Sequence, residues 1–246
     1  MEGIVYVAHG SRRASGNAGF ISFIRNVMAS VDCEIQNFGF LENATPSILQ
    51  AIEQCIESGA NEITIVPILL LPGIHAKVDI PAEIHRAKIM YPHMSFRYGT
   101  PLGSDEVMMD MVLKRLTEKG FGEGKADAVL LVGHGSQEAG AAMEFVTLAE
   151  MLFVNKGIPL EIGYLTTSPD YGKQAKVMLE KASRKLFVVP FLLYSGGFTV
   201  KMNTAMALLA ADNEVEIVMC DAIGFDDALI PLVIKRMEEA KREEFF

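Results

Sequence analysis

Short apolar runs alternate along this chain with longer segments whose apolar residues recur at helical spacing. The runs are mostly apolar or β-branched, with Ser95–Gly99 the weakest, which is typical of strands covered on both faces. We expect eight strands, at Ile4–Ala8, Ile35–Leu41, Ile63–Leu71, Ser95–Gly99, Ala128–Val132, Leu160–Leu165, Leu186–Tyr194 and Val215–Cys220.

The segments between these runs predict helices. They are Phe20–Ala29, Ile48–Ile56, Ile80–Met90, Val107–Leu116, Met143–Phe153, Gln174–Ala182, Thr199–Leu209 and Ala228–Ala240. Strands that alternate with helices form parallel sheets joined by right-handed crossovers. The pattern therefore predicts an α/β fold with parallel sheets flanked by helices.

The second half of the chain repeats the first. The triplet His-Gly-Ser at residue 9 returns at residue 134, and three more parallels follow in the same order. They pair Gly39-Phe-Leu-Glu42 with Gly163-Tyr-Leu-Thr166, Val66-Pro-Ile-Leu-Leu70 with Val189-Pro-Phe-Leu-Leu193, and Gly103 ahead of Lys114-Arg115 with Gly224 ahead of Lys235-Arg236. We predict two homologous domains, residues 1–121 and 126–246, joined near the glycine-rich Lys119–Lys125.

Composition narrows the class of protein. Half of the 246 residues are hydrophobic, so each repeat can bury its own core. The net charge of −9 argues against nucleic-acid binding, which needs clustered Lys and Arg.

The three cysteines, Cys33, Cys55 and Cys220, are too few and too scattered for a disulfide framework, and none forms a CxxC pair. The sequence shows neither a signal-peptide pattern nor an apolar run of membrane-spanning length. We expect a cytoplasmic enzyme with no membrane partner.

Three potentially reactive side chains follow the first three strands. They are His9, Glu42 and His75, and the strand ends of a parallel sheet emerge at one edge, so we expect the three to meet there. The second repeat keeps only His134, with Thr166 and Phe198 in place of the other two. The candidate site therefore belongs to the first repeat, and His134 is more simply explained as a strand-end residue satisfied by backbone groups.

Two imidazoles and a carboxylate can act in two ways. They can bind a divalent cation such as Fe²⁺, Co²⁺, Ni²⁺ or Zn²⁺ and leave positions open for exchange. They can also transfer protons near neutral pH. The residues alone do not separate these uses.

The motifs resemble those of the sirohydrochlorin chelatases. The resemblance lies in His9-Gly-Ser-Arg12, in Phe40-Leu-Glu42 followed by Pro46, and most specifically in the run from Val66 through His75-Ala-Lys-Val-Asp-Ile-Pro81. It covers nearly the whole chain, and the duplicated layout looks most like the two-domain members that insert iron during siroheme synthesis.

This resemblance implies two flavodoxin-like, chelatase-like domains with an active-site cleft between them. It implies insertion of a divalent metal ion, Fe²⁺ by preference, into sirohydrochlorin without ATP and without a permanently bound cofactor. His9, His75 and Glu42 match the family's active-site residues, so they are expected to contact the metal ion and to receive pyrrole protons. Cobalt insertion toward cobalamin is the nearest alternative.

Sirohydrochlorin carries eight carboxylates, so an acidic protein must concentrate positive charge where it binds. Arg12, Arg13 and Lys77 adjoin the histidines, and Lys201 lies in the corresponding loop of the second repeat. We expect these four to bind substrate carboxylates. A non-catalytic carrier of tetrapyrrole or metal is the alternative to an enzyme, and internal duplication favours a monomer.

Overall fold

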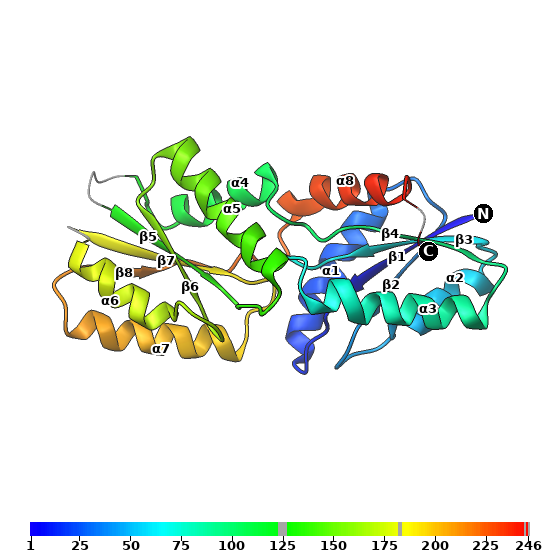
Figure 1. The fold of residues 1–246 in the computed structure, drawn as a ribbon, viewed down its shortest axis with the longest axis horizontal. Coiled ribbons are helices and arrows are strands. Elements are labelled where there is room, and N and C mark those ends of the chain that lie inside the picture. The colour runs from blue at the N-terminus through cyan, green and yellow to red at the C-terminus, as the bar shows by residue number, and fades with distance from the viewer. Residues whose placement is uncertain (123–126, 182–183, 244, 246) are drawn as a thin grey trace. The chain divides into compact units, whose positions relative to one another are not determined.

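Two four-stranded parallel sheets form the core of the computed structural model, which describes residues 1–122, 127–181, 184–243 and 245 (Figure 1). The first sheet contains β1 (Glu2–Ala8), β2 (Ile35–Phe40), β3 (Glu62–Pro67) and β4 (Ser95–Tyr98), in the order β2-β1-β3-β4. The second contains β5 (Asp127–Gly133), β6 (Leu160–Tyr164), β7 (Lys185–Phe191) and β8 (Glu216–Met219), in the order β6-β5-β7-β8. Both sheets have the same topology, as the sequence repeat predicts.

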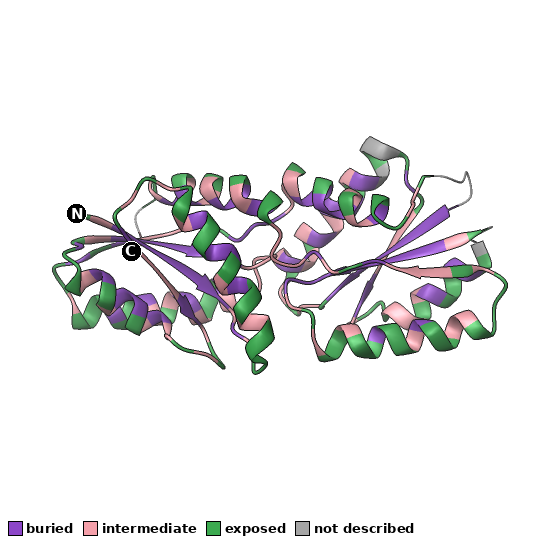
Figure 2. Ribbon diagram, turned by 180° about the vertical axis from the view of Figure 1, so that it is seen from behind, coloured by how far each residue is buried: buried purple, intermediate pink, exposed green. Residues whose placement is uncertain are grey.

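Helices cover both faces of each sheet, which explains why the central strands β1, β3, β5 and β7 are buried along nearly their whole length. The helices are α1 (Ala14–Ala29), α2 (Ile48–Glu57), α3 (Ile80–Met90), α4 (Glu106–Thr117), α5 (Ala139–Lys156), α6 (Tyr171–Lys181), α7 (Gly197–Ala211) and α8 (Ile230–Ala240). Figure 2 shows the central strands of both sheets as mostly buried, whereas the edge strands β2, β4, β6 and β8 are less buried. The α/β prediction is confirmed.

Two helices pack in the unit formed mainly by the other sequence repeat. The chain forms two compact units, Met1–Gly103 with Phe225–Phe246, and Ser104–Gly224. Helix α4 belongs to the first repeat but packs on β7 and α5, whereas α8 belongs to the second repeat but packs on β3 and α1. The domain boundary predicted between residues 121 and 126 stays a prediction about the repeat, and residues 123–126 of the predicted junction lie outside the described residues.

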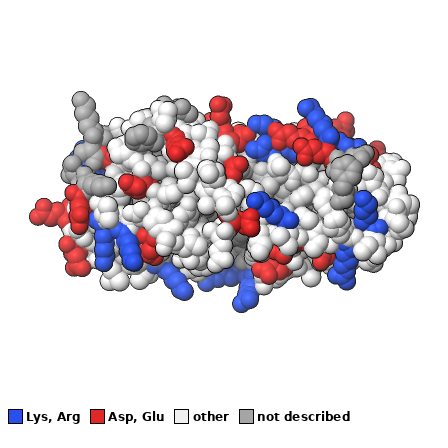
Figure 3. Space-filling view, viewed as in Figure 1, with Lys and Arg blue, Asp and Glu red and all other residues white. Residues whose placement is uncertain are grey.

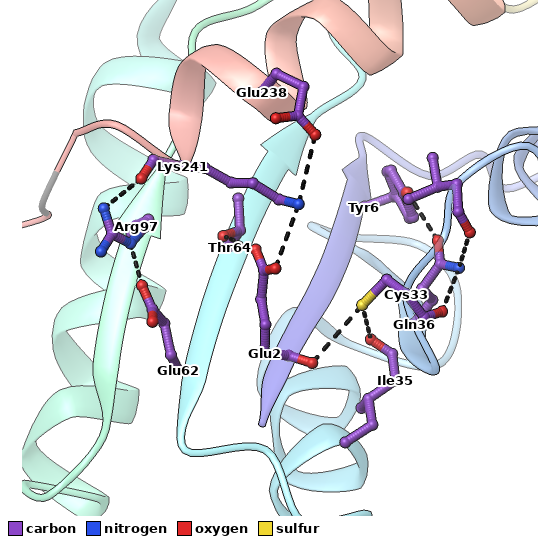
Figure 4. Close-up of polar contacts among 11 residues, drawn as sticks. Glu2, Tyr6, Cys33, Ile35, Gln36, Glu62, Thr64, Arg97, Glu238 and Lys241 are labelled. Atoms are coloured by element: carbon purple, nitrogen blue, oxygen red, sulfur yellow. Dashed lines mark hydrogen bonds and ion pairs between the residues drawn. The ribbon is translucent and has the colours of Figure 1, made fainter.

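Helix α8 is fixed to the first unit by apolar and charged contacts. Leu232, Val233 and Met237 are buried, and full burial of such a side chain contributes about 1.5–3 kcal/mol. At the end of the helix, the ammonium of Lys241 lies 3.3 Å from a Glu2 carboxylate oxygen and 3.4 Å from one of Glu238 (Figure 4). The guanidinium of Arg97 on β4 also donates to the carbonyl oxygen of Lys241.

Several predicted element bounds are wrong. Strands β3 and β7 end at Pro67 and Phe191, so the apolar residues that follow lie in loops. Helix α1 begins at Ala14, whereas the predicted helix began at Phe20. The prediction missed the first turns because Ser15, Gly16 and Asn17 are poor helix formers and interrupt the apolar pattern. The end of the predicted helix at Ala182 lies outside the described residues.

A π-helical turn, His75–Asp79, runs directly into α3. The sequence analysis predicted only the α-helix that follows it. Such turns are rare and often occur at functional sites.

Candidate active site

The candidate site lies at the carboxyl ends of β1, β2 and β3. In the order β2-β1-β3-β4, the chain passes from β1 to one side of the sheet and then crosses to β3 on the other side. Ligands of open α/β sheets bind at such a switch point, where the loops diverge. His9 follows β1 and His75 follows β3, so the two histidines flank it.

The structure brings His9, Glu42 and His75 together in the first unit, as predicted from the strand ends. The imidazole rings of His9 and His75 meet edge to face, with centroids 4.6 Å apart and an interplanar angle of 78°. The Nε2 atom of His9 lies 3.3 Å from a carboxylate oxygen of Glu42. All three side chains are partly exposed, so solutes can reach them.

The hydrogen bond made by Nδ1 of His9 indicates which ring nitrogen carries a proton. Nδ1 lies 2.9 Å from the carbonyl oxygen of Gly10, and a carbonyl can only accept, so Nδ1 carries the proton. In the neutral ring, Nε2 then presents a lone pair toward the carboxylate of Glu42. A proton or a metal ion between these two acceptors would satisfy both.

Gly10 allows the loops after β1 and β2 to approach closely. Its φ is +90°, and a Cβ atom there would lie 1.9 Å from the carbonyl oxygen of Glu42. The backbone N–H of Glu42 in turn donates to the carbonyl oxygen of His9 at 3.0 Å. The glycine of the His-Gly-Ser triplet therefore sets the spacing between His9 and Glu42.

His75 has a carboxylate partner that the sequence analysis missed. Its Nδ1 lies 2.7 Å from Oδ2 of Asp79, on the same helical turn. The spacing of four residues could have revealed this pair, because residues four apart share a helix face.

Tyr98 on β4 is a second residue that the sequence analysis missed. Its hydroxyl donates to the carbonyl oxygen of Ala76 at 2.7 Å, next to His75. Burial raises the pKa of Tyr98 above its ordinary value, so the hydroxyl remains a donor. No local sequence signal marks this contact, because it joins distant segments.

The predicted cationic residues lie in different places. Arg12 is exposed, and its Nε donates to the side-chain oxygen of Asn43 at 3.2 Å, so it lies beside the Glu42 loop. Arg13 precedes α1 and Lys77 lies on the π-helical turn, both exposed, whereas Lys201 is an exposed residue on α7 of the other unit. On the face seen in Figure 3, acidic and basic side chains are interspersed.

Within the described part of the chain, no three His, Cys, Asp or Glu side chains are arranged so that they could hold a metal ion. The metal-binding role predicted for His9, His75 and Glu42 therefore stays a prediction. Among the same residues, no helix is both long and apolar enough to cross a membrane.

The corresponding edge of the second unit carries His134, Thr166 and Phe198. The rings of His134 and Phe198 also meet edge to face, with centroids 5.2 Å apart. The hydroxyl of Thr166 donates to the carbonyl oxygen of His134 at 2.7 Å. This edge has an imidazole but lacks the second imidazole and the carboxylate found at the first.

Comparison with known proteins identifies relatives over the whole length. The CbiX family model matches twice, at residues 3–119 and 128–240. The sirohydrochlorin ferrochelatase of Priestia megaterium is 33% identical, with 100% of this chain and 94% of that protein covered. The sirohydrochlorin cobaltochelatase of the same organism is 29% identical, with 99% and 81% covered.

Solved structures give the same result. The structure of SirB from Bacillus subtilis with Fe³⁺ superimposes with a TM-score of 0.88 at 31% identity, covering 97% of this chain and 95% of that one. The sirohydrochlorin chelatase SirB from Bacillus subtilis subspecies spizizenii in complex with cobalt gives a TM-score of 0.87 at 29% identity, covering 100% and 99%. Both agree with the two-sheet architecture described above.

Proposed function

The chain belongs to the CbiX family, and on that premise we propose that it is a sirohydrochlorin chelatase that inserts Fe²⁺ to form siroheme. The observation that carries this proposal is the cluster at the switch point of the first sheet. There, His9 lies against both His75 and Glu42. Metal insertion needs these two kinds of group, because imidazole accepts metal ions and protons and a carboxylate accepts either.

Insertion has three chemical requirements. The metal ion must lose bound water, the flat macrocycle must deform, and two pyrrole N–H protons must leave as the metal–nitrogen bonds form. We assign the first and third to His9 and His75, whose lone pairs can replace water on the metal ion and receive protons.

Glu42 is suited to carry protons away from His9. A proton taken up by Nε2 of His9 lies next to the carboxylate at 3.3 Å, and the Glu42 side chain is 52% exposed. The proton can therefore pass from the pyrrole through His9 and Glu42 to water. A contact between Glu42 and the metal ion stays a prediction, because among the described residues no three such side chains are arranged to hold one.

The surface around His75 suits both parts of a tetrapyrrole. Ile74 and Val78 are exposed apolar residues one helical turn apart, on either side of His75, and can pack against the apolar face of the macrocycle. Arg12, Arg13 and Lys77 are exposed cations that can pair with its peripheral carboxylates. Lys201 stays a candidate for a further carboxylate contact.

Cobalt insertion is the second candidate. It is favoured by the likeness to the Priestia megaterium cobaltochelatase and to the cobalt complex of SirB. Imidazole ligands do not discriminate strongly between Fe²⁺ and Co²⁺, and Co²⁺ binds most sites more tightly than Fe²⁺. We prefer iron because the ferrochelatase of that organism is the more similar of the two.

The test is an anaerobic absorbance time course of sirohydrochlorin with Fe²⁺ or Co²⁺ and a small molar fraction of the protein. We expect several turnovers per chain, with a higher kcat/KM for Fe²⁺. A spectral shift that stops at one equivalent, with no acceleration of insertion, would instead identify a carrier.

A further inference from the structure

Asp79 is placed so that it can control the orientation and tautomer of His75. The distance of 2.7 Å between Asp79 Oδ2 and His75 Nδ1 is that of a strong, charge-assisted hydrogen bond. An ionised carboxylate only accepts, so Nδ1 must donate and therefore carries the ring proton. Nε2 of His75 is then the nitrogen that presents a lone pair.

The helix backbone holds this pair in place. Both residues lie on the π-helical turn His75–Asp79, and the side chains of Ala76 and Ile80 anchor that turn in the core, at 4% and 0% exposure. The hydroxyl of Tyr98 holds the carbonyl oxygen of Ala76 from the adjacent strand β4. The turn that carries His75 and Asp79 is therefore fixed to the sheet.

Helix capping does not account for Asp79. An aspartate just before a helix usually accepts a hydrogen bond from a backbone N–H of the first turn. Asp79 directly precedes α3, but it has helical backbone angles (φ −72°, ψ −48°) and its side chain makes no capping hydrogen bond. The carboxylate is directed to His75 instead.

The second repeat offers an internal comparison. Aligning Val66-Pro67 with Val189-Pro190 without a gap places Phe198 opposite His75 and Met202 opposite Asp79. Met202 is fully buried in the core of its unit. The carboxylate is thus present where the histidine is present and is replaced by an apolar residue where the histidine is replaced.

We propose that Asp79 is a positioning residue that acts through His75, holding it in the Nδ1–H tautomer with Nε2 directed to the incoming metal ion. This role rests on the proposed chelatase function and deepens it. The other histidine of the site reaches the same tautomer by a different contact, because Nδ1 of His9 donates to the backbone carbonyl of Gly10. Of the two rings, only that of His75 depends on a replaceable side chain for its tautomer.

The experiment compares Asp79→Ala and Asp79→Asn with Glu83→Ala as the matched control. Glu83 is a carboxylate on α3 whose ion-pair partner is Arg86. Three quantities are measured: the Kd for Co²⁺ without tetrapyrrole, kcat and KM for insertion, and the His75 tautomer from ring ¹⁵N NMR shifts, assigned with His75→Ala.

For Asp79→Ala we expect Co²⁺ affinity and kcat to fall about 10- to 100-fold, as for loss of other carboxylates that support ligating histidines. The KM for sirohydrochlorin should stay within about twofold, because Asp79 orients a ligand and does not bind the macrocycle. The His75 signals should change toward the Nε2–H tautomer. Asp79→Asn should recover most of the loss, since its amide oxygen still accepts from Nδ1.

A double-mutant cycle tests whether Asp79 acts through His75. In a His75→Ala background, Asp79→Ala should have almost no further effect on Co²⁺ affinity. An equal loss in both backgrounds would overturn the proposal, as would Asp79→Ala behaving like Glu83→Ala in affinity and tautomer.

Failure of the proposed function has a different signature. A wild-type protein that does not accelerate insertion contradicts the chelatase function, while the tautomer and the Co²⁺ affinity still decide the role of Asp79. Normal turnover with no effect of Asp79→Ala contradicts the positioning role alone.

Discussion

The two His-Gly-Ser edges of this protein have the same backbone and different chemistry. In the first unit, the N–H of Glu42 donates to the carbonyl oxygen of His9 at 3.0 Å, and in the second the N–H of Thr166 donates to that of His134 at 3.1 Å. The glycines that allow this approach have φ values of +90° and +94°. The loop scaffold therefore does not require the reactive side chains, and the functional role of His9, Glu42 and His75 stays a prediction that substitutions can test.

The side chains of the second edge make local contacts instead. The Thr166 hydroxyl donates to the backbone of its own edge, and Phe198 occupies the position of His75 against the retained histidine. An edge-to-face pair of rings survives in both units, but only in the first do both rings carry nitrogen lone pairs. If the first edge performs the chemistry, substitutions there must have effects that the same substitutions at the second edge lack.

The largest difference in insertion rate is expected between His9→Ala and His134→Ala. The first removes a group assigned to both metal transfer and proton transfer, so kcat/KM should fall about 10²- to 10⁴-fold. His134→Ala should leave the rate within about twofold, because its imidazole contacts Phe198 and the carbonyl oxygen of Gly135 and neither group takes up protons or metal. Insertion rates measured with sirohydrochlorin and Fe²⁺ check both, and equal losses would break the comparison.

A smaller difference is expected between Glu42→Gln and Thr166→Ala. Glutamine keeps the size of the side chain but not its charge, so proton removal from His9 should slow and kcat should fall about 10- to 100-fold. Thr166→Ala removes one hydrogen bond to the backbone, which costs about 1 kcal/mol of stability and no activity. Steady-state kinetics and urea unfolding separate the two effects, and unchanged kinetics in Glu42→Gln would remove Glu42 from the mechanism.

Substitutions of Gly10 and Gly135 separate effects on stability from effects on activity. Gly10→Ala and Gly135→Ala should each lower the free energy of unfolding by about 1–3 kcal/mol, because both φ values are unfavourable for alanine. Only Gly10→Ala should also reduce activity, about tenfold, because its Cβ atom pushes on the backbone of Glu42. Denaturant unfolding paired with rates below the melting range checks this, and a fully active, stable Gly10→Ala would contradict the spacing argument.

The smallest effects are expected for the cations. Lys77→Ala should raise the KM for sirohydrochlorin no more than about fivefold, since an exposed ion pair contributes about 1 kcal/mol or less. Lys201→Ala, on α7 of the second unit, should raise the KM for sirohydrochlorin less. Added salt should weaken wild-type binding and shrink both differences, because exposed charges are screened. A larger effect at Lys201 than at Lys77 would reverse the ranking.

Sequence patterns predicted the strands, the duplication and the three clustered side chains, because each depends on local periodicity or on a strand end. His9, Glu42 and His75 are distant in sequence, but parallel topology brings them to one edge, so their proximity could be predicted without coordinates. The Asp79 contact was also within reach, from its helical spacing relative to His75.

The exchange of α4 and α8 could not be predicted in this way. Each helix would show the same apolar periodicity on either sheet, so the sequence pattern cannot indicate which of the two sheets it covers. The Tyr98 contact to Ala76 is similarly invisible, because a tyrosine hydroxyl selects a partner from another segment of the chain. The tautomers of His9 and His75 follow from individual hydrogen-bond distances, which no residue pattern encodes.

The placement of α8 also sets the order in which the protein can fold during its synthesis. The second unit, Ser104–Gly224, is continuous, whereas the first unit also includes residues 225–246, whose helix α8 packs on β3 and α1. Domains usually fold in the order in which they leave the ribosome. Here we expect the opposite order, so that the unit carrying His9, Glu42 and His75 is completed only after α8 has been released.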